Sequence, residues 1–430
     1  MPEIVRQSLW PGIGLTSMQT DKFKTSVLSV SLLRPLSHEE ASLSALTPRV
    51  LCRGTGRYPD MAALSVRLEE LYGARLEPSV RKKGEIQCVG FVADFIDGRY
   101  LPGKPDQLAA VVELLGEVLL RPAGGGACFE HGYVEAERTN LADEIAASKN
   151  DKVAFASRRL RELMCAEEAF GVNRLGDERE ARAITPEALW RHYQEILATS
   201  RVEAWYIGPR PAEHVAAAFR EALSALPRSQ PFTETKTEVI RSTAGLIRQF
   251  EETMDVGQGK LALGMRMGTA LGDPNYPAAM LATAIYGGTP ASKLFLHVRE
   301  RLQLCYYASA LMEGAKGLMI VSSGIDADNR AAAEEGIFKQ WEDVRNGDFS
   351  AEELSAARLS LCDVLHAASD NPHSLEDYYL GQTAAGLKTD PDTMAGLLEE
   401  ITASQVADAA RASTWDSVYF LHGGEIDEDI

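Results

Sequence analysis

The sequence predicts an α+β protein of two similar units, each a mainly antiparallel sheet with helices packed on one face. Three observations support this. The same order of strand and helix patterns occurs in both halves of the 430-residue chain. A polar, proline-containing segment separates the halves, and apolar residues make up 45% of the chain, enough for sizeable cores. A repeated order of elements indicates duplication, and strands followed by runs of helices are typical of α+β folds.

The first half begins with a strand pattern and returns to one after a helix. Residues 23–33 and 87–96 are typical of strands. Between them, leucines recur at helical spacing over residues 61–72, and Gly73 follows as a C-cap. Further elements are expected as helices over residues 108–120, 133–145 and 186–197 and as a late strand over residues 202–207.

The second half repeats this order. Residues 261–267 are typical of a strand and residues 277–285 of a helix. Residues 292–302 place four large apolar side chains on one helical stripe. The remaining elements are expected as strands over residues 305–311, 317–325 and 418–421 and as helices over residues 330–345 and 351–368.

The domain boundary is expected near the middle of the chain. Residues 226–237 combine prolines, hydroxyl residues and charges without an apolar period. We therefore expect an N-terminal domain over residues 1–225, a linker over 226–240 and a C-terminal domain over 241–430.

Charge and composition exclude several classes of function. Acidic residues outnumber basic ones by 62 to 44, a net charge of −18, which repels nucleic acid and anionic membranes. The six scattered cysteines form no Cys-x-x-Cys pair, which is typical of reduced thiols. The N-terminal residues lack a signal-peptide core, and no stretch approaches the length of a membrane span. A cytoplasmic protein without a membrane span is expected.

The most specific pattern lies at residues 286–306. A Tyr-Gly-Gly-Thr-Pro turn opens a helix that contains Ser-Lys-Leu-Phe and ends in Val-Arg-Glu-Arg-Leu, and a strand then begins with Cys-Tyr-Tyr. This resembles the pitrilysin/insulinase family of zinc metallopeptidases, in which an arginine and a tyrosine seven residues apart help to hold the substrate. Arg299 and Tyr306 match both in type and in spacing. A guanidinium and a phenol can both donate to a developing oxyanion. The alternative is a surface arginine at a helix end and a tyrosine in the core.

The resemblance also identifies what is missing. Active members of the family carry His-x-x-Glu-His on a helix shortly before a Gly-Thr pair, where the histidines bind zinc and the glutamate is the general base. Counting back from Gly54, the ligand and base positions are Ala45, Pro48 and Arg49. Neither histidine is present, Pro48 has no acid, and Arg49 places a positive charge where the metal would lie.

A third zinc ligand in the family is a glutamate on a later helix, with another glutamate seven residues before it. Glu137 and Glu144 fit these positions and would share one helix face. With the histidines lost, the resemblance implies a vestigial site, because zinc usually needs three or four protein ligands. A second near-match, His373 with Glu376 and Asp377, is a chance match of a short motif.

The resemblance therefore implies a peptidase-like N-terminal domain without its zinc motif and a C-terminal domain that carries the Arg/Tyr pair. It predicts a catalytically inactive subunit, with no cofactor, that pairs with a zinc-bearing homologous peptidase, or forms a homodimer, and helps to position a peptide substrate. The pattern is also similar to a bacterial non-zinc branch linked to modification of elongation factor P. Two alternatives stay open: an active zinc metallopeptidase with unusual ligands, and a stand-alone peptide-binding scaffold.

Overall fold

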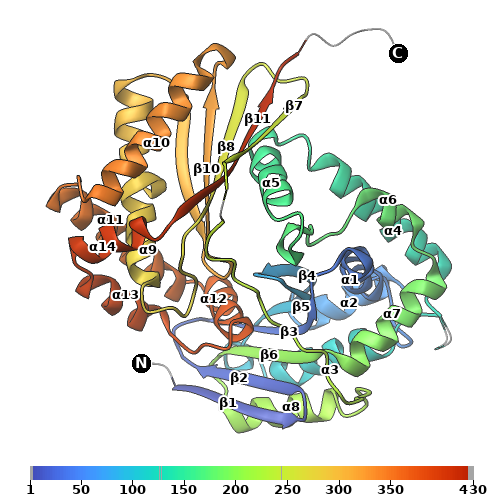
Figure 1. Ribbon diagram of the computed structural model, residues 1–430. Coiled ribbons are helices and arrows are strands. Elements are labelled where there is room, and N and C mark those ends of the chain that lie inside the picture. The colour runs from blue at the N-terminus through green and yellow to red at the C-terminus, as the bar shows by residue number, and fades with distance from the viewer. Residues whose placement is uncertain (1–2, 125, 127, 244, 425–430) are drawn as a thin grey trace, which may run out of the picture. The chain divides into compact units, whose positions relative to one another are not determined.

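The computed structural model describes residues 3–124, 126, 128–243 and 245–424. The outer ends of the predicted ranges 1–225 and 241–430, and positions 125, 127 and 244 within them, lie outside the described residues. The chain forms two compact units (Figure 1). Unit 1 comprises Met1–Ala147, Val172–Lys236 and Asn371–Leu380, and unit 2 comprises Ser148–Gly171, Thr237–Asp370 and Gly381–Ile430. Each unit thus takes one short segment from the other half of the chain, while the assignment of the predicted ranges as peptidase-like domains stays a prediction.

Unit 1 contains a six-stranded sheet in the order β1-β2-β6-β3-β5-β4. The strands are β1 (Glu3–Trp10), β2 (Ile13–Gln19), β3 (Thr25–Pro35), β4 (Arg75–Lys83), β5 (Ile86–Ile96) and β6 (Arg201–Gly208). Neighbouring strands are antiparallel except for β2 and β6. The central strand β3 is buried along almost its whole length, because side chains on both of its faces are covered. Strand β4 lies at the edge.

The helices of unit 1 share one large apolar core with the sheet. They are α1 (His38–Leu51), α2 (Met61–Glu70), α3 (Gln107–Leu120), α4 (His131–Ala147), α6 (Glu178–Ala183), α7 (Pro186–Thr199) and α8 (Ala212–Ala222). Helix α1 begins after Ser37, whose hydroxyl accepts from the Glu40 N–H at 3.3 Å, a standard N-cap. The core fixes α1 between the sheet and α4, so residues on these two helices can meet.

Unit 2 contains a five-stranded sheet in the order β7-β11-β8-β10-β9. The strands are β7 (Arg248–Thr253), β8 (Gly259–Arg266), β9 (Tyr307–Glu313), β10 (Leu318–Ile325) and β11 (Thr414–His422). Only β7 and β11 pair in parallel among the described strands of this sheet. The helices on one face are α9 (Tyr276–Thr283), the π-helical turns η3 (Ala284–Gly288) and η4 (Leu294–Arg301), α10 (Arg330–Asn346), α11 (Ala351–Ser369), α13 (Pro391–Glu400) and α14 (Ala403–Arg411).

The opposite face of the unit 2 sheet is covered by α5 (Lys152–Met164), which comes from the first half of the chain (Figure 1). Phe155, Leu160 and Met164 of α5 share a core with side chains of β8, β10 and β11. Gly264 permits this close approach, because a Cβ there would lie 2.5 Å from the Met164 sulfur.

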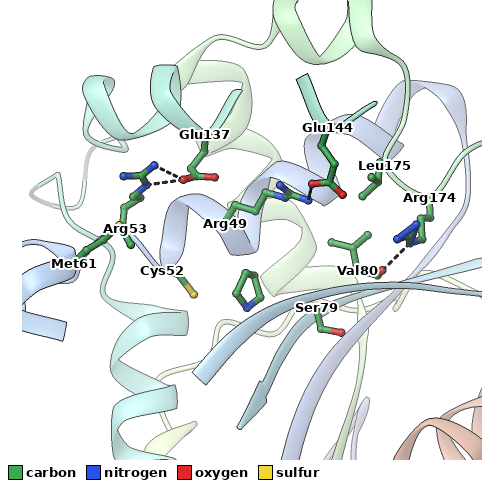
Figure 2. Close-up of a pocket in the computed structure, with 11 residues that line it drawn as sticks. Arg49, Cys52, Arg53, Met61, Ser79, Val80, Glu137, Glu144, Arg174 and Leu175 are labelled. Carbon is green, nitrogen blue, oxygen red and sulfur yellow. Dashed lines mark hydrogen bonds and ion pairs between the residues drawn. The ribbon is translucent and has the colours of Figure 1, made fainter. Parts of the chain in front are cut away.

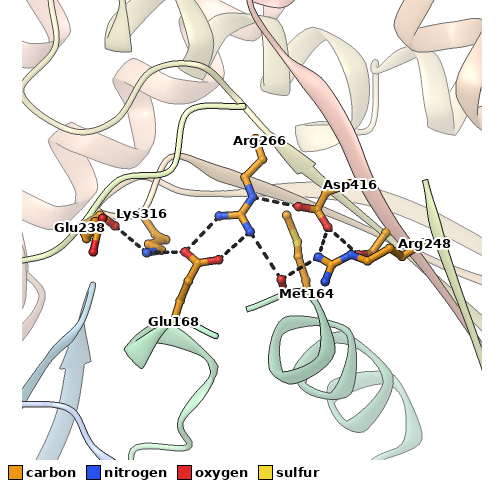
Figure 3. A network of polar contacts seen from close by, with 8 residues as sticks. Met164, Glu168, Glu238, Arg248, Arg266, Lys316 and Asp416 are labelled. Atoms are coloured by element: carbon orange, nitrogen blue, oxygen red, sulfur yellow. Dashed lines mark hydrogen bonds and ion pairs between the residues drawn. The ribbon is translucent and has the colours of Figure 1, made fainter. Parts of the chain in front are cut away.

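A buried charge network anchors the segment that follows α5 (Figure 3). Glu168 accepts from the Arg266 guanidinium at 2.6 Å and from the Lys316 ammonium at 2.6 Å. Arg266 also donates to Asp416 at 3.0 Å. Since all four side chains are at most 8% exposed, each charge depends on its partners to offset desolvation.

Helix α12 (Pro372–Ala384) has the corresponding role in unit 1, to which residues 371–380 belong. Tyr379 stacks on Trp205 of β6 with ring centroids 5.1 Å apart. Glu376, only 2% exposed, accepts from the Ser29 hydroxyl at 2.5 Å and from Arg81 at 2.5 Å. The near-match at residues 373–377 is therefore an anchor of this helix, because its glutamate is already held by an arginine.

The predicted α+β fold of two similar units is confirmed, with two refinements. Each sheet is mixed, because it contains one parallel pair, and each carries one helix on its second face. Within the described residues, no helix combines the length and apolarity required to cross a bilayer.

Candidate functional site

Helix α1 carries the three residues that are predicted to stand at the positions of the zinc motif. Ala45 is fully buried in the unit 1 core, and Pro48 is buried at the start of the last helical turn. The helix continues through Pro48 to Leu51, although a proline contributes no N–H to the ladder. Arg49 lies one turn after Ala45 on the same side of the helix, and its side chain points toward Glu144 of α4 (Figure 2).

Two glutamates of α4, Glu137 and Glu144, are ion-paired to arginines at the C-terminal end of α1 (Figure 2). Glu144 accepts from Arg49 at 2.6 Å, and Glu137 accepts from Arg53 at 2.5 Å. The seven-residue spacing does place the two carboxylates on one face, as predicted. Arg49 lies in the last turn of α1 and Arg53 in the turn that follows the helix, and each arginine pairs with one carboxylate.

These groups line a cavity of about 530 Å³ between α1, α4 and strand β4. Its remaining lining residues are Cys52, Met61, Pro78, Ser79, Val80, Arg174 and Leu175. Burial, with a smaller contribution from the nearby Glu137 and Glu77 carboxylates, raises the pKa of the Cys52 thiol to about 12. Cys52 therefore stays protonated at neutral pH.

The side chains present do not fit a zinc ion. The two carboxylates are the only acidic groups of the cavity lining, and each already neutralises a guanidinium. Across the described part of the chain, His, Cys, Asp and Glu side chains form no group of three or more suited to hold a metal. The positive charge beside the Glu144 carboxylate therefore comes from the Arg49 guanidinium and not from a metal ion.

Arg299 and Tyr306 lie in unit 2, around the start of the edge strand β9. Arg299 belongs to the π-helical turn η4, stacks over the Phe295 ring at 4.6 Å and has a side chain 39% exposed. Tyr306 is 60% exposed, and its hydroxyl donates to Asp326 at 3.3 Å. The alternative of a core tyrosine is therefore wrong, because the phenol faces solvent.

The connection between these two residues has a constrained backbone. Gln303 adopts a φ of 55°, which is uncommon for a residue other than glycine. Hydrogen bonds from Leu304 N–H to Val298 at 3.2 Å and from Tyr306 N–H to Gly324 at 2.8 Å flank it. Such backbone geometry persists only where the surrounding structure holds it.

Sequence reasoning missed two charged residues of the unit 1 cavity, Arg53 and Arg174. Arg53 had a usable signal, since it follows Arg49 by only four residues along the chain. Arg174 had none, because it lies 94 residues from Val80, whose carbonyl it contacts.

Comparison with known proteins gives a consistent assignment. Residues 183–361 match the family model described as "Peptidase M16 inactive domain". The chain is 30% identical over 416 residues to the "Probable inactive metalloprotease YmfF" of Bacillus subtilis (strain 168), with 96% of each protein covered.

Solved structures share the fold over nearly the whole chain. A conserved protein from Enterococcus faecalis V583 has a TM-score of 0.90 and 26% identity, covering 99% of this chain and 100% of that one. A protease from Helicobacter pylori has a TM-score of 0.80 and 12% identity, with 98% and 100% covered. A peptidase M16 inactive domain from Pseudomonas fluorescens has a TM-score of 0.78 and 15% identity, with 98% of each covered. The last two likenesses concern the fold alone.

The comparisons agree with the chemistry of the unit 1 cavity, whose side chains do not fit a zinc ion. The whole-length likeness to the Bacillus protein extends over both the lost zinc positions and the Arg299–Tyr306 segment. This chain belongs to the M16 peptidase family, the pitrilysin/insulinase-type metallopeptidases, and is an inactive metalloprotease-like member of it.

Proposed function

We propose that this chain is the non-zinc subunit of a two-chain peptidase and that Arg299 and Tyr306 hold the peptide in a site completed by a zinc-bearing partner. The observation that carries the proposal is a contrast between the two units. In unit 1, the two carboxylates at the predicted zinc positions are neutralised by ion pairs with arginines, whereas the polar groups of Arg299 and Tyr306 in unit 2 stay accessible.

The accessible groups suit a donor role toward a developing oxyanion. Arg299 has its nearest carboxylate, Glu300, at 3.5 Å, which is long for a committed ion pair. The Tyr306 hydroxyl donates a hydrogen bond to Asp326 at 3.3 Å, which is long for an O–H donor, so a better acceptor can replace Asp326. The backbone around Gln303 supports the proposal, because a held, strained connection positions the two side chains.

The test is reconstitution with a zinc-bearing M16 subunit from the same source. Arg299→Ala and Tyr306→Phe should each reduce turnover of a quenched fluorogenic peptide by about a hundredfold, because loss of one oxyanion donor costs about 3 kcal/mol. Association, followed by size-exclusion chromatography, should be unchanged.

Matched controls are Arg301→Ala, an exposed arginine on the same helical turn, and Tyr100→Phe, a tyrosine 47% exposed in unit 1. Neither should alter turnover. Full activity of a folded Arg299→Ala/Tyr306→Phe double variant in the complex would end the composite-site proposal. Sedimentation of the isolated chain tests the alternative that it forms a homodimer. The cytoplasmic location stays a prediction.

A further inference from the structure

The cavity of unit 1 has a charge character opposite to that of the chain. Three guanidiniums and two carboxylates line it, an excess of one positive charge in a protein of net charge −18. Figure 2 shows Arg49, Arg53 and Arg174 around the same space. An anion is therefore attracted here and repelled by most of the remaining surface.

Arg174 has the largest unused donor capacity of the three. Its Nε donates to the Val80 carbonyl at 3.2 Å, which fixes the guanidinium against strand β4. Among the described residues, its two terminal nitrogens contact no hydrogen-bond acceptor or ion-pair partner. Arg49 likewise uses a single nitrogen, toward Glu144. Two partly committed guanidiniums thus remain available for a planar, two-oxygen acceptor.

The ion pairs already present oppose such a ligand only weakly. The Glu144 side chain is 47% exposed, and an ion pair of this exposure contributes little to stability because solvent screens it. Arg49 can therefore turn from Glu144 to a ligand at little cost. The Arg53–Glu137 pair is more buried and stays in place, because Glu137 is 12% exposed.

The edge of the sheet decides how a peptide can lie beside this cavity. Residues two apart along a strand direct their backbone groups to the same side, so Pro78 and Val80 share one side of β4. Pro78 has no N–H, and the Val80 carbonyl is occupied by Arg174. Lys82 also binds the Val172 carbonyl at 3.0 Å, which holds the neighbouring segment alongside β4. A peptide consequently cannot run past β4 as an added strand.

The C-terminal carboxylate of a peptide satisfies all of these constraints. Its single negative charge meets the arginines without the stronger repulsion that Glu137 and Glu144 would exert on a phosphate dianion. Met61, Val80 and Leu175 give the cavity an apolar side, and about 530 Å³ is within the usual range for small-ligand sites. We propose that this cavity binds the C-terminal carboxylate of a peptide, with Arg174 and Arg49 as the carboxylate-binding residues and an apolar last side chain beside Leu175.

This site does not rest on the proposed pairing, because every residue involved belongs to unit 1 and the test uses the isolated chain. Fluorescence anisotropy would measure binding of a fluorescein-labelled hexapeptide pool, randomised at its last three positions, as the free acid and as the C-terminal amide. The free-acid pool should bind at least tenfold more tightly than the amide, since a hydrogen-bonded charge is lost in the amide. N-acetyl-leucine should displace the free-acid pool, whereas N-acetyl-leucinamide and inorganic phosphate should not.

Arg174→Ala should weaken free-acid binding about tenfold or more, and this exposed side chain can be removed without disturbing the core. Arg191→Ala, an exposed arginine of α7 outside the cavity, is the matched control and should bind like the parent chain. Equal affinity for acid and amide, no measurable binding of the acid pool, displacement by phosphate, or unchanged binding by the Arg174→Ala variant would each overturn the proposal. Circular dichroism of each variant shows that the fold is retained.

Discussion

The buried network of unit 2 gives the sharpest stability prediction, through the substitution Glu168→Ala. The substitution removes the acceptor of one Arg266 hydrogen bond at 2.6 Å, another at 3.1 Å, and the Lys316 contact at 2.6 Å. It leaves two cations that are 2% and 0% exposed without their shared carboxylate. Removing one partner of a buried ion pair costs about 3–5 kcal/mol. Because Arg266 keeps Asp416, and Lys316 still donates to the Glu238 carbonyl, we expect the lower end, about 3 kcal/mol.

The loss should be confined to unit 2, so hydrogen exchange read by mass spectrometry is the suitable assay. Peptides from β8 and β10 should lose protection, while peptides from β3 and β5 of unit 1 should keep theirs. Glu167→Ala, an exposed neighbour, is the control and should change stability by no more than about 0.5 kcal/mol. A loss below about 1 kcal/mol in unit 2, or equal losses in both units, would refute the view that the network anchors the segment after α5.

The same network predicts an acid dependence. Burial acts to raise the pKa of Glu168, but hydrogen bonds and charges of Arg266 and Lys316 outweigh it and lower the pKa. A carboxyl group with a lowered folded pKa stabilises the protein above its unfolded pKa of about 4.3. This contribution disappears as the pH falls through the folded value. Denaturant titrations of unit 2 at pH 7 and pH 3 should therefore differ less for Glu168→Ala than for the parent chain.

Two further predictions concern unit 1. Metal analysis of the purified chain should find no stoichiometric zinc. The double variant Ala45→His/Arg49→His should still cleave no fluorogenic peptide, because Pro48 supplies no general base. Chelator-sensitive cleavage by the parent chain would contradict this prediction. Burial lowers the pKa of His192 to about 4, and its ring meets the Ser44 hydroxyl at 2.9 Å. As the pH falls, this histidine is protonated in the unfolded chain before it is protonated in the folded chain. The free energy of unfolding of unit 1 should therefore fall by about 3 kcal/mol between pH 6.5 and pH 4. In denaturant titrations, His192→Gln should reduce this dependence of stability on pH.

Much of the secondary structure could be predicted because its signals are local. Helix α4 spans His131–Ala147 where residues 133–145 were expected, and α11 spans Ala351–Ser369 where residues 351–368 were expected. Strand β4 was missed because it is an edge strand whose nine residues include Pro78 and five charged side chains, so it lacks an apolar pattern. The N-terminal strands β1 and β2 were missed as well, since Glu3–Trp10 alternates polar and apolar residues only weakly.

The assignment of α5 to unit 2 could not be inferred from its own amphipathic pattern. Its stripe of Phe155, Leu160 and Met164 predicts that one face is buried but contains no information on which sheet buries it. The sheet that buries this face is set by strands more than 90 residues further along the chain. One of them, β8, contains Gly264, whose lack of a side chain leaves room for Met164. Long-range packing of this kind is decided by the topology of the whole chain.

The sequence by itself predicted the loss of zinc chemistry, because metal binding depends on residue type and Ala45, Pro48 and Arg49 cannot serve as zinc ligands. It also determined the presence and spacing of Arg299 and Tyr306. Only the tertiary structure decided which side chains pair with the carboxylates of Glu137 and Glu144. Glu144 meets Arg49 across 95 positions of sequence, and Glu137 meets Arg53 across 84. These pairs exist because packing of α1 against α4 brings opposite charges within 3 Å of each other. Glu137, whose side chain is 12% exposed, requires its positive partner to offset desolvation, whereas Glu144 is 47% exposed and depends less on Arg49.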